Sequence, residues 1–249
     1  MGSRSQKKIL IFLYILIIIS AIYLYFSYRY YNHVEGFESS IPEYIISDVH
    51  YINLDRSIDR NNKIIKELEK IKPIPVIRWK AIDGKDLSKE TINNTCKYPN
   101  GVHTTEKRKS GEVGCYLSHK TLIEHLGKLN VNPNAGHLIL EDDIIIDDKF
   151  LDKLKKLIPH IPSDWGILYF GLGEKKLKNV KNEIGEVEFG WGCYGFMIKH
   201  SKIPEILLKI NKMYAPIDNM ILDNFKELCA YATVEDMIFA TAAEVSSIG

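Results

Sequence analysis

Short apolar runs alternate along the chain with segments of helical spacing. Residues 49–54 and 76–82 have the composition of buried strands, and the segment from residue 57 to about 71 has the spacing of an amphipathic helix. Its predicted buried face consists of Ile64, Ile65 and Leu68. A strand, a helix and a strand at this spacing form a βαβ unit, which implies a parallel sheet.

The same alternation continues to the end of the chain. We predict an irregular polar segment at 86–109, helices at 110–129, from 147 to just before Pro159, at 201–213 and at 217–228, strands at 137–146, 165–170 and 189–198, and a lysine-rich loop at 174–186. This order predicts an α/β fold with a Rossmann-type, mostly parallel sheet flanked by helices.

One predicted strand carries three carboxylates. The run His137-Leu138-Ile139-Leu140-Glu141-Asp142-Asp143-Ile144-Ile145-Ile146 is apolar on both sides of the acids, so Glu141, Asp142 and Asp143 lie where the strand leaves the core. Ligands bind at that edge of an open α/β sheet. Adjacent carboxylates repel one another unless a cation or hydrogen-bond donors hold them, and Mg²⁺ or Mn²⁺ prefers such oxygen ligands. In extended backbone Glu141 and Asp143 point one way and Asp142 the other.

An acidic cluster after a strand has a simpler alternative explanation. Such clusters also form helix N-caps or solvated turns, as Asp147 and Asp148 do if they cap the next helix.

The N-terminal segment has the length of a membrane span. Residues 9–28 are twenty consecutive uncharged residues, and a helix of that length is about 30 Å long, the thickness of the hydrocarbon core. A cleaved signal peptide is the alternative, but bulky Tyr and Phe continue to the end of the run where small residues are expected. Arg4, Lys7 and Lys8 precede the span. The positive-inside rule then predicts a single-pass, type II protein with residues 1–30 as tail and anchor, 31–44 as a stem, and 45–249 as a lumenal or exoplasmic domain.

Composition excludes some classes of function. Outside the tail there are 30 Lys and Arg (33 minus 3) against 32 Asp and Glu, so the basic excess of a nucleic-acid-binding surface is absent. The four cysteines contain no C-x-x-C pair, which argues against a structural zinc site.

Two further segments are candidates for binding an anionic ligand. Asn53, Asp55, Arg56 and Arg60 follow the first strand, where the arginines can pair with a diphosphate or form surface ion pairs with Asp55 and Asp59.

The second segment is Gly111-Glu112-Val113-Gly114. It precedes a predicted helix N-terminus, a natural anion site, and the alternative is a plain helix entry with glycines for close packing. Ser118 and His119 are neighbours on a helix and are not expected to form a nucleophile pair.

Together these segments resemble glycosyltransferase family 25, which includes bacterial lipooligosaccharide galactosyltransferases and collagen hydroxylysine galactosyltransferases. The resemblance covers about residues 46–225. The matching stretches are Tyr51-Ile52-Asn53-Leu54-Asp55-Arg56 with Arg60, Ala81-Ile82-Asp83-Gly84, Gly111 to His119, Leu138 to Asp143 and, more loosely, Gly195-Phe196 and Pro216-Ile217-Asp218.

This resemblance implies a GT-A-type domain that transfers a hexose, galactose before glucose, from a UDP-sugar. Glu141-Asp142-Asp143 stands in place of the usual Asp-x-Asp motif, so Asp143 and Glu141 would hold Mn²⁺ (or Mg²⁺). The family's members are described as inverting, and Asp218 is the candidate base, with a helix N-cap as its alternative role. The other residues expected at the donor are Asn53, Asp55, Arg56, Arg60, Asp83, Gly84, Glu112, Gly114, Ser118, His119 and Asp142.

The expected acceptor is a glycan, a lipid-linked saccharide or a hydroxylysine. No histidine follows His200 to supply the late metal ligand of many GT-A enzymes. Two alternatives therefore stay open: a catalytically silent relative that binds a sugar or a partner, and another metal-dependent nucleotide enzyme.

Overall fold

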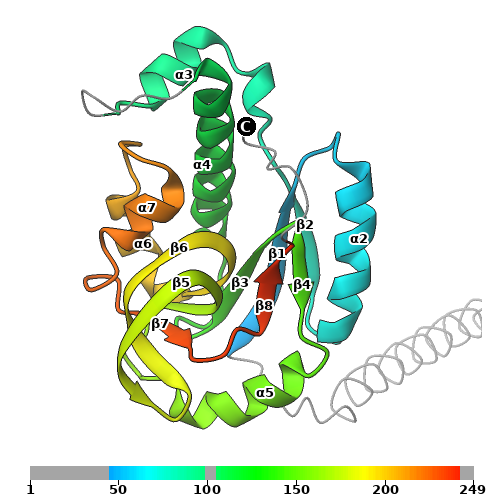
Figure 1. Cartoon of the computed structure of the whole chain (residues 1–249), viewed down its shortest axis with the longest axis vertical. Coiled ribbons are helices and arrows are strands. Elements are labelled where there is room, and N and C mark those ends of the chain that lie inside the picture. The colour runs from blue at the N-terminus through cyan, green and yellow to red at the C-terminus, as the bar shows by residue number, and fades with distance from the viewer. Residues whose placement is uncertain (1–44, 99–104, 242–249) are drawn as a thin grey trace, which may run out of the picture. The chain divides into compact units, whose positions relative to one another are not determined.

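A six-stranded sheet in the order β2-β1-β3-β6-β5-β7 forms the centre of the computed structural model, which describes residues 45–98 and 105–241 (Figure 1). Its strands are β1 (Ile46–Asn53), β2 (Val76–Lys80), β3 (Gly136–Glu141), β5 (Ile167–Lys181), β6 (Ile184–Lys199) and β7 (Ala230–Thr233). A second, two-stranded sheet pairs β4 (Ile144–Ile146) with β8 (Ile238–Ala240).

The predicted sheet with flanking helices is confirmed, but the sheet is mixed, because β6 runs opposite to the other five strands. β1 runs parallel to β2 and β3, as the βαβ unit requires. β6 pairs antiparallel with β3, β5 and β7. The reason is a long β5–β6 hairpin, because a hairpin returns the chain beside the strand it has just left.

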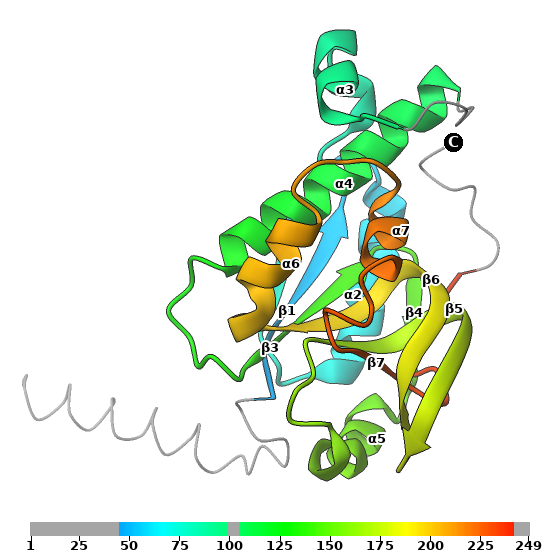
Figure 2. The same ribbon diagram turned by 90° about the vertical axis from the view of Figure 1, so that its left-hand side faces the viewer.

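Helices cover both faces of the sheet (Figures 1 and 2). The α-helices are α2 (Ile58–Leu68), α3 (Lys89–Thr95), α4 (Glu106–Leu126), α5 (Phe150–Leu157), α6 (Ile203–Lys209) and α7 (Ile217–Leu222). Single 3₁₀ turns occur at η1 (Glu69–Ile71), η2 (Gly84–Asp86), η3 (Ile158–His160) and η4 (His200–Lys202).

Side-chain alternation along the strands divides the core into two layers. Ile52 and Ile139 point to one face and pack with α4, α6 and α7. Val49 and Leu138 point to the other face and pack with α2, α5 and the β4–β8 pair. Every strand residue in the middle of the sheet therefore faces a helix or the β4–β8 pair, which explains the nearly continuous apolar runs in the sequence.

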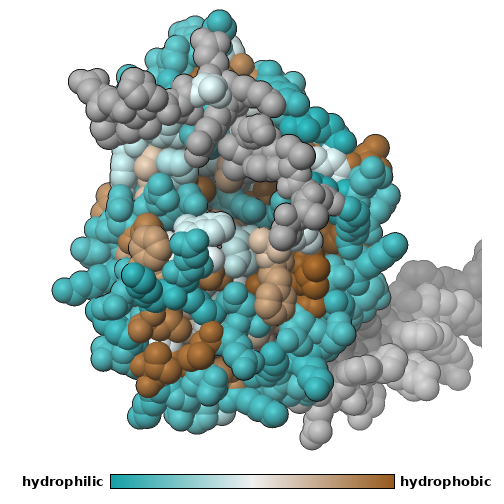
Figure 3. Space-filling view, viewed as in Figure 1, coloured by the Kyte–Doolittle hydropathy of each residue, from teal (hydrophilic) through white to brown (hydrophobic). Residues whose placement is uncertain are grey.

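The β4–β8 pair covers the core layer that contains Val49 and Leu138. Its other face, which also carries apolar side chains, is turned toward solvent. Ile144 and Ile146 are buried, whereas Ile145 and its register partner Phe239 are 45% and 41% exposed. Figure 3 shows the resulting hydrophobic area over these two strands, right of centre, as one of several on this face; another lies at the lower left.

Several predicted features differ from those observed, among them a loop, an irregular segment and one side chain. The predicted loop at 174–186 is the β5–β6 hairpin, whose two turn residues Asn182 and Glu183 have φ of 49° and 65°. Positive φ at both central residues is the type I′ geometry that joins twisted strands. The predicted irregular segment contains α3, whose Ser88 cap accepts a hydrogen bond from Thr91 N–H. Ile65, predicted to be buried, is 44% exposed, because α2 turns Ile64 and Leu68 inward instead.

The predicted membrane span at residues 9–28 and the stem at 31–44 lie outside the described residues. Among the residues that are described, no helix is long and apolar enough to cross a bilayer.

Helix α4 packs against the loop after β2 through two glycines. A Cβ at Gly114 would lie 2.7 Å from the backbone N of Gly84 and the backbone O of Ile82, and one at Gly84 would lie 1.9 Å from Ser110 O. Ser118 completes the contact, since its Oγ donates to Gly114 O at 2.7 Å and accepts from Ile82 N at 2.8 Å. The glycines of α4 thus allow close backbone packing, the alternative that the sequence had left open.

We expect Gly114→Ala to lower the free energy of unfolding by about 1–3 kcal/mol, because the backbone of Ile82 and Gly84 must move away from the new methyl group. Urea unfolding of the full chain measures this change. Gly127→Ala is the matched control, since its Cβ would meet only the side-chain methyl of Ile203, which can move. Equal effects of the two substitutions would contradict the close-packing explanation.

Candidate functional site

A pocket opens at the carboxyl ends of β1 and β3, bordered by α2, α4 and the loop after β2. It brings together nine of the residues predicted from the sequence: Arg56, Arg60, Asp83, Gly84, Ser118, His119, Glu141, Asp142 and Asp143. The three acids of β3 therefore lie in a concave site at the sheet margin, where the strand pattern placed them.

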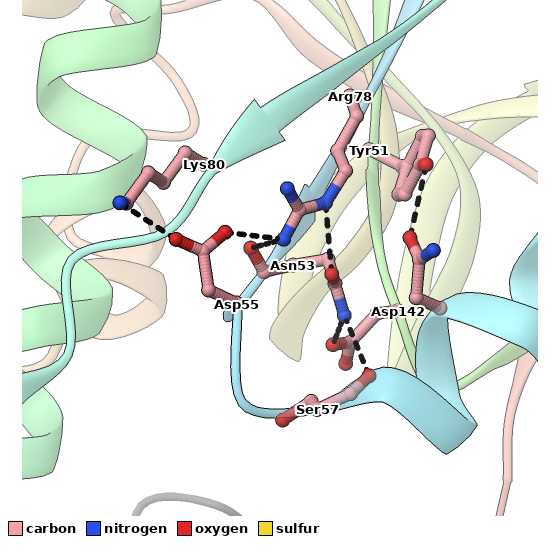
Figure 4. A network of polar contacts seen from close by, with 8 residues as sticks. Tyr51, Asn53, Asp55, Ser57, Arg78, Lys80 and Asp142 are labelled. Atoms are coloured by element: carbon pink, nitrogen blue, oxygen red, sulfur yellow. Dashed lines mark hydrogen bonds and ion pairs between the residues drawn. The ribbon is translucent and has the colours of Figure 1, made fainter.

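Asp142 is held on the β1 side of the pocket (Figure 4). Its Oδ2 accepts a 2.6 Å hydrogen bond from Asn53 Nδ2, and its Oδ1 lies 3.1 Å from Arg60 Nη1. The same Arg60 nitrogen is 3.1 Å from Asp143 Oδ2. One guanidinium thus bridges two neighbouring carboxylates and lowers their mutual repulsion.

Asn53 is fixed on all sides and does not line the pocket. It is 1% exposed, its Nδ2 also donates to Ser57 O at 3.3 Å, and its Oδ1 accepts from Arg78 Nε at 2.9 Å (Figure 4). Its role in this structure is to orient Asp142.

The backbone at Asp143 is held by the end of β8. The carbonyl oxygen of Asp143 accepts from the Thr241 N–H at 2.8 Å and from the Thr241 hydroxyl at 3.0 Å. The acidic turn is therefore fixed by a strand about a hundred residues later in the chain, an element that the sequence pattern did not predict.

Glu141 lies on the other side of β3, toward α4. Burial, and after it the charges of Asp143, Asp142 and Asp218, raise its pKa to about 8 against the opposing effect of Arg60. Without a cation, Glu141 is therefore mostly protonated at pH 7. The adjacent acids predicted from the sequence therefore repel one another in this pocket, and the raised pKa of Glu141 expresses that repulsion.

The negative charge of Asp218 also raises the pKa of Glu141, although Asp218 does not line the pocket. It is the second residue of α7, where Pro216 is the N-cap, so the alternative N-cap role was wrong. Its Oδ2 accepts from Gly192 N at 3.3 Å and its Oδ1 from Asn219 N at 3.0 Å. These two bonds orient the carboxylate, and its charge reaches Glu141.

The nearby thiols are not nucleophiles. Burial raises the pKa of both Cys115 and Cys193 well above the ordinary value, and the charges of Glu141 and Asp218 add to the effect. Since the thiolate is the reactive form, both thiols are inert at neutral pH.

The arginine after β1 pairs with the loop after β2. Arg56 donates to Asp83, and this hydrogen bond lowers the pKa of the Asp83 carboxyl. Asp83 also accepts from Lys85 N at 3.1 Å, which caps η2. The Arg56 side chain is still 44% exposed, so it faces both the loop and the pocket.

Three other predicted residues lie outside the pocket lining. Asp55 points away and pairs with Arg78 at 2.8 Å and Lys80 at 2.6 Å (Figure 4). Glu112 is 6% exposed and accepts a hydrogen bond from the Tyr98 hydroxyl. Gly114 packs against Gly84, as described above.

Helix α4 begins at Glu106 and not at Ser110, which removes the predicted anion site at Gly111–Gly114. The N–H groups of these residues lie inside the helix, where they are used in its own hydrogen bonds. The face that α4 presents to the pocket is instead made of Gly111, Cys115, Ser118 and His119. Cys115 was missed, although its spacing from Gly111 and Ser118 is helical.

We expect Glu141→Gln to stabilise the metal-free protein at pH 8 by on the order of 3 kcal/mol and to change little near pH 4.5. A carboxyl whose pKa rises from 4.5 to about 8 on folding binds more protons in the folded state, so it destabilises the fold as the pH rises through that window. Urea unfolding in EDTA at the two pH values measures the difference.

Glu124→Gln is the control, because Glu124 is 43% exposed beside Lys120. If the stability of Glu141→Gln depends on pH as that of the wild type does, the pKa of Glu141 is not raised in the folded protein.

Comparison with known proteins identifies the family of this chain. The model of glycosyltransferase family 25 (LPS biosynthesis protein) matches residues 46–213. Human procollagen galactosyltransferase 2 is 27% identical over 178 residues, which are 64% of this chain and 28% of that protein. Mouse inactive glycosyltransferase 25 family member 3 is 25% identical over 162 residues, 61% of this chain and 26% of that protein. The match thus spans little more than a quarter of each relative.

Among solved structures, galactosyltransferase LgtC in complex with donor and acceptor sugar analogues aligns over 72% of this chain and 69% of its own, with 11% identity and a TM-score of 0.36. The family match covers both the arginine segment after β1 and the acidic end of β3. The chain belongs to glycosyltransferase family 25.

Proposed function

We propose that this chain transfers a hexose, galactose before glucose, from a UDP-sugar to a hydroxyl group of a glycan, a lipid-linked saccharide or a hydroxylysine, with inversion at the anomeric carbon. One observation carries the proposal. In a member of this family, the carboxylates of Glu141, Asp142, Asp143 and Asp218 concentrate negative charge at one edge of the pocket. Arg60 is the cation that lowers the pKa of Glu141 against them. The galactosyltransferase relatives support the choice of sugar.

The residues at this edge fit a hard divalent cation, Mn²⁺ or Mg²⁺. Glu141 and Asp143 offer carboxylate oxygens, which such ions prefer. The raised pKa of Glu141 means that its charge lacks compensation, and a cation beside it would supply that compensation. When bound, the ion would neutralise charge on the departing diphosphate.

The chain's own residues would divide the remaining work. Asn53 and Arg60 hold Asp142 and keep the acidic turn in place. Arg56, exposed at the pocket mouth beside Asp83, is positioned to meet a phosphate. Asp218 is our candidate for the base that takes the acceptor proton, because Gly192 and Asn219 fix its orientation and its charge reaches the same site.

A catalytically silent relative is the second candidate function. A mouse family member with similar coverage is named as inactive, and Glu141 stands at the first acidic position of the motif. Such a protein would bind UDP or a sugar without turnover. The third candidate, another metal-dependent nucleotide enzyme, would release phosphate or pyrophosphate instead of UDP.

We also propose that residues 9–28 anchor the chain in a membrane as a type II protein, with the domain on the lumenal or exoplasmic side. The support is the uncharged run and the basic residues before it.

The first test is UDP release by the purified full chain from a panel of UDP-hexoses with Mn²⁺. We expect release with UDP-galactose, abolished by EDTA, and an approximately 10²-fold or larger loss of kcat in Asp143→Asn, because one oxygen ligand and one charge are removed. Asp148→Asn is the control, since that side chain is 86% exposed. Undiminished activity in Asp143→Asn rejects the metal role, and UDP binding without turnover on any donor and acceptor favours the silent relative.

The second test concerns the base. We expect Asp218→Asn to lower kcat by about 10²–10⁴-fold and to leave the KM for the UDP-sugar within a few-fold. Asp223→Asn, at the end of the same helix, should leave both unchanged. An undiminished kcat in Asp218→Asn would assign the base to another residue.

A further inference from the structure

A second polar cluster lies at the other end of the same strands. Asp48 and His50 are on β1, and His137, the register partner of Asp48, is on β3. All three side chains are in the sheet interior, with exposed fractions of 8%, 1% and 0%. Five residues of strand separate Asp48 from Asn53, so the cluster is about 16 Å from the pocket edge.

The three side chains converge on one point. Asp48 Oδ1 lies 2.7 Å from His137 Nδ1 and 3.3 Å from His50 Nε2. One potential ligand atom from each residue lies within 4.8 Å of the other two. Two ligands bound to zinc at 2.0–2.1 Å with tetrahedral angles are about 3.3 Å apart, so the Asp48–His50 spacing already has the required value.

Among the described residues, the polar contact of the His50 ring is the 3.3 Å approach of its Nε2 to Asp48 Oδ1. Neither of its ring nitrogens forms a hydrogen bond with any atom of the described residues. A buried donor or acceptor left unsatisfied is costly, and native structures contain few of them. The Nε2 atom faces the carboxylate of Asp48, so an ion there would satisfy this nitrogen.

His200 holds His137 from behind. The His137 Nε2 and the His200 Nδ1 are 3.0 Å apart, and His200 comes directly after β6. If His137 Nε2 carries a proton and donates a hydrogen bond to His200 Nδ1, then His137 Nδ1 can offer a lone pair on the side of Asp48. Metal-binding histidines commonly use their second nitrogen in this way, and the bond fixes the tautomer.

We infer that Asp48, His50 and His137 form a structural zinc site, with His200 as the positioning residue and water as the fourth ligand. Two imidazole nitrogens and one carboxylate oxygen are zinc ligands of ordinary type. On binding, the metal takes both atoms of the short Asp48–His137 hydrogen bond, and the proton of that bond is released to solvent while His137 Nε2 keeps its proton toward His200. The ion joins β1 to β3 at the end of the sheet opposite the pocket, so it acts on stability and has no part in the chemistry.

The test is the zinc content of the full chain, purified without a polyhistidine tag and dialysed against zinc-buffered solution. We expect about one zinc per chain by elemental analysis, visible d–d bands of four-coordinate Co²⁺ on substitution, and a melting temperature higher by roughly 5–10 °C with zinc at a hundred times its Kd. His50→Gln should lower zinc affinity more than tenfold and remove the melting shift.

Two controls keep this test decisive. Asp48→Asn serves if His50→Gln fails to fold, and His160→Gln changes a histidine that pairs only with Asn182 among the described residues and should retain the metal. Less than a tenth of a zinc per chain, or equal retention in His50→Gln and the wild type, would overturn the inference. Stoichiometric binding of another metal with zinc excluded would overturn the choice of zinc. UDP release is not the readout, so failure here leaves the proposed transferase function unaffected, and the reverse also holds.

Discussion

The repulsion among carboxylates at the end of β3 is the constraint on which the rest of this structure depends. Glu141, Asp142 and Asp143 follow one another in the chain, and Asp218 adds a fourth negative charge from α7. Two residues reduce this repulsion. Arg60 contacts Asp142 and Asp143, and Asn53 donates a hydrogen bond to Asp142. Glu141 remains under-compensated, and this is the physical basis of our proposal that the pocket binds a cation.

The strands of the parallel half carry polar residues at both ends and apolar residues between them. β1 carries Asp48 and His50 as its third and fifth residues and ends with Asn53, while β3 carries His137 as its second residue and ends with Glu141. Because β1 and β3 are parallel neighbours, like ends meet, and each end assembles its own group of side chains. A buried sheet of this kind fixes two separate polar sites with the same few hydrogen-bonded strands.

The antiparallel half supplies what the parallel half lacks. The β5–β6 hairpin brings Gly192 to Asp218, and His200, directly after β6, lies beside His137. β8 returns to hold the backbone of Asp143 through Thr241. Each of these contacts joins residues far apart in sequence, and the mixed sheet is what makes them neighbours.

Local pattern alone predicted much of this protein. The βαβ unit, the long helix before β3 and the exit of three acids from a buried strand all follow from apolar spacing, because that spacing directly records which residues face the core. The motif order also indicated the family. The hairpin at 174–186 was missed because its lysines hide the alternation of a strand, and its turn depends on positive φ at Asn182 and Glu183, which are not glycines.

Only the tertiary structure decided which side chains meet. Arg60 could have paired with Asp59 or a phosphate, and the fold places it on Asp142 and Asp143. Cysteine spacing argued against zinc, yet His50 and His137, 87 positions apart, come together because parallel strands bring their starts side by side. The sequence determines which residues are buried, since burial follows local hydrophobicity. The partners of buried charges depend on strand order and register, which no local pattern encodes.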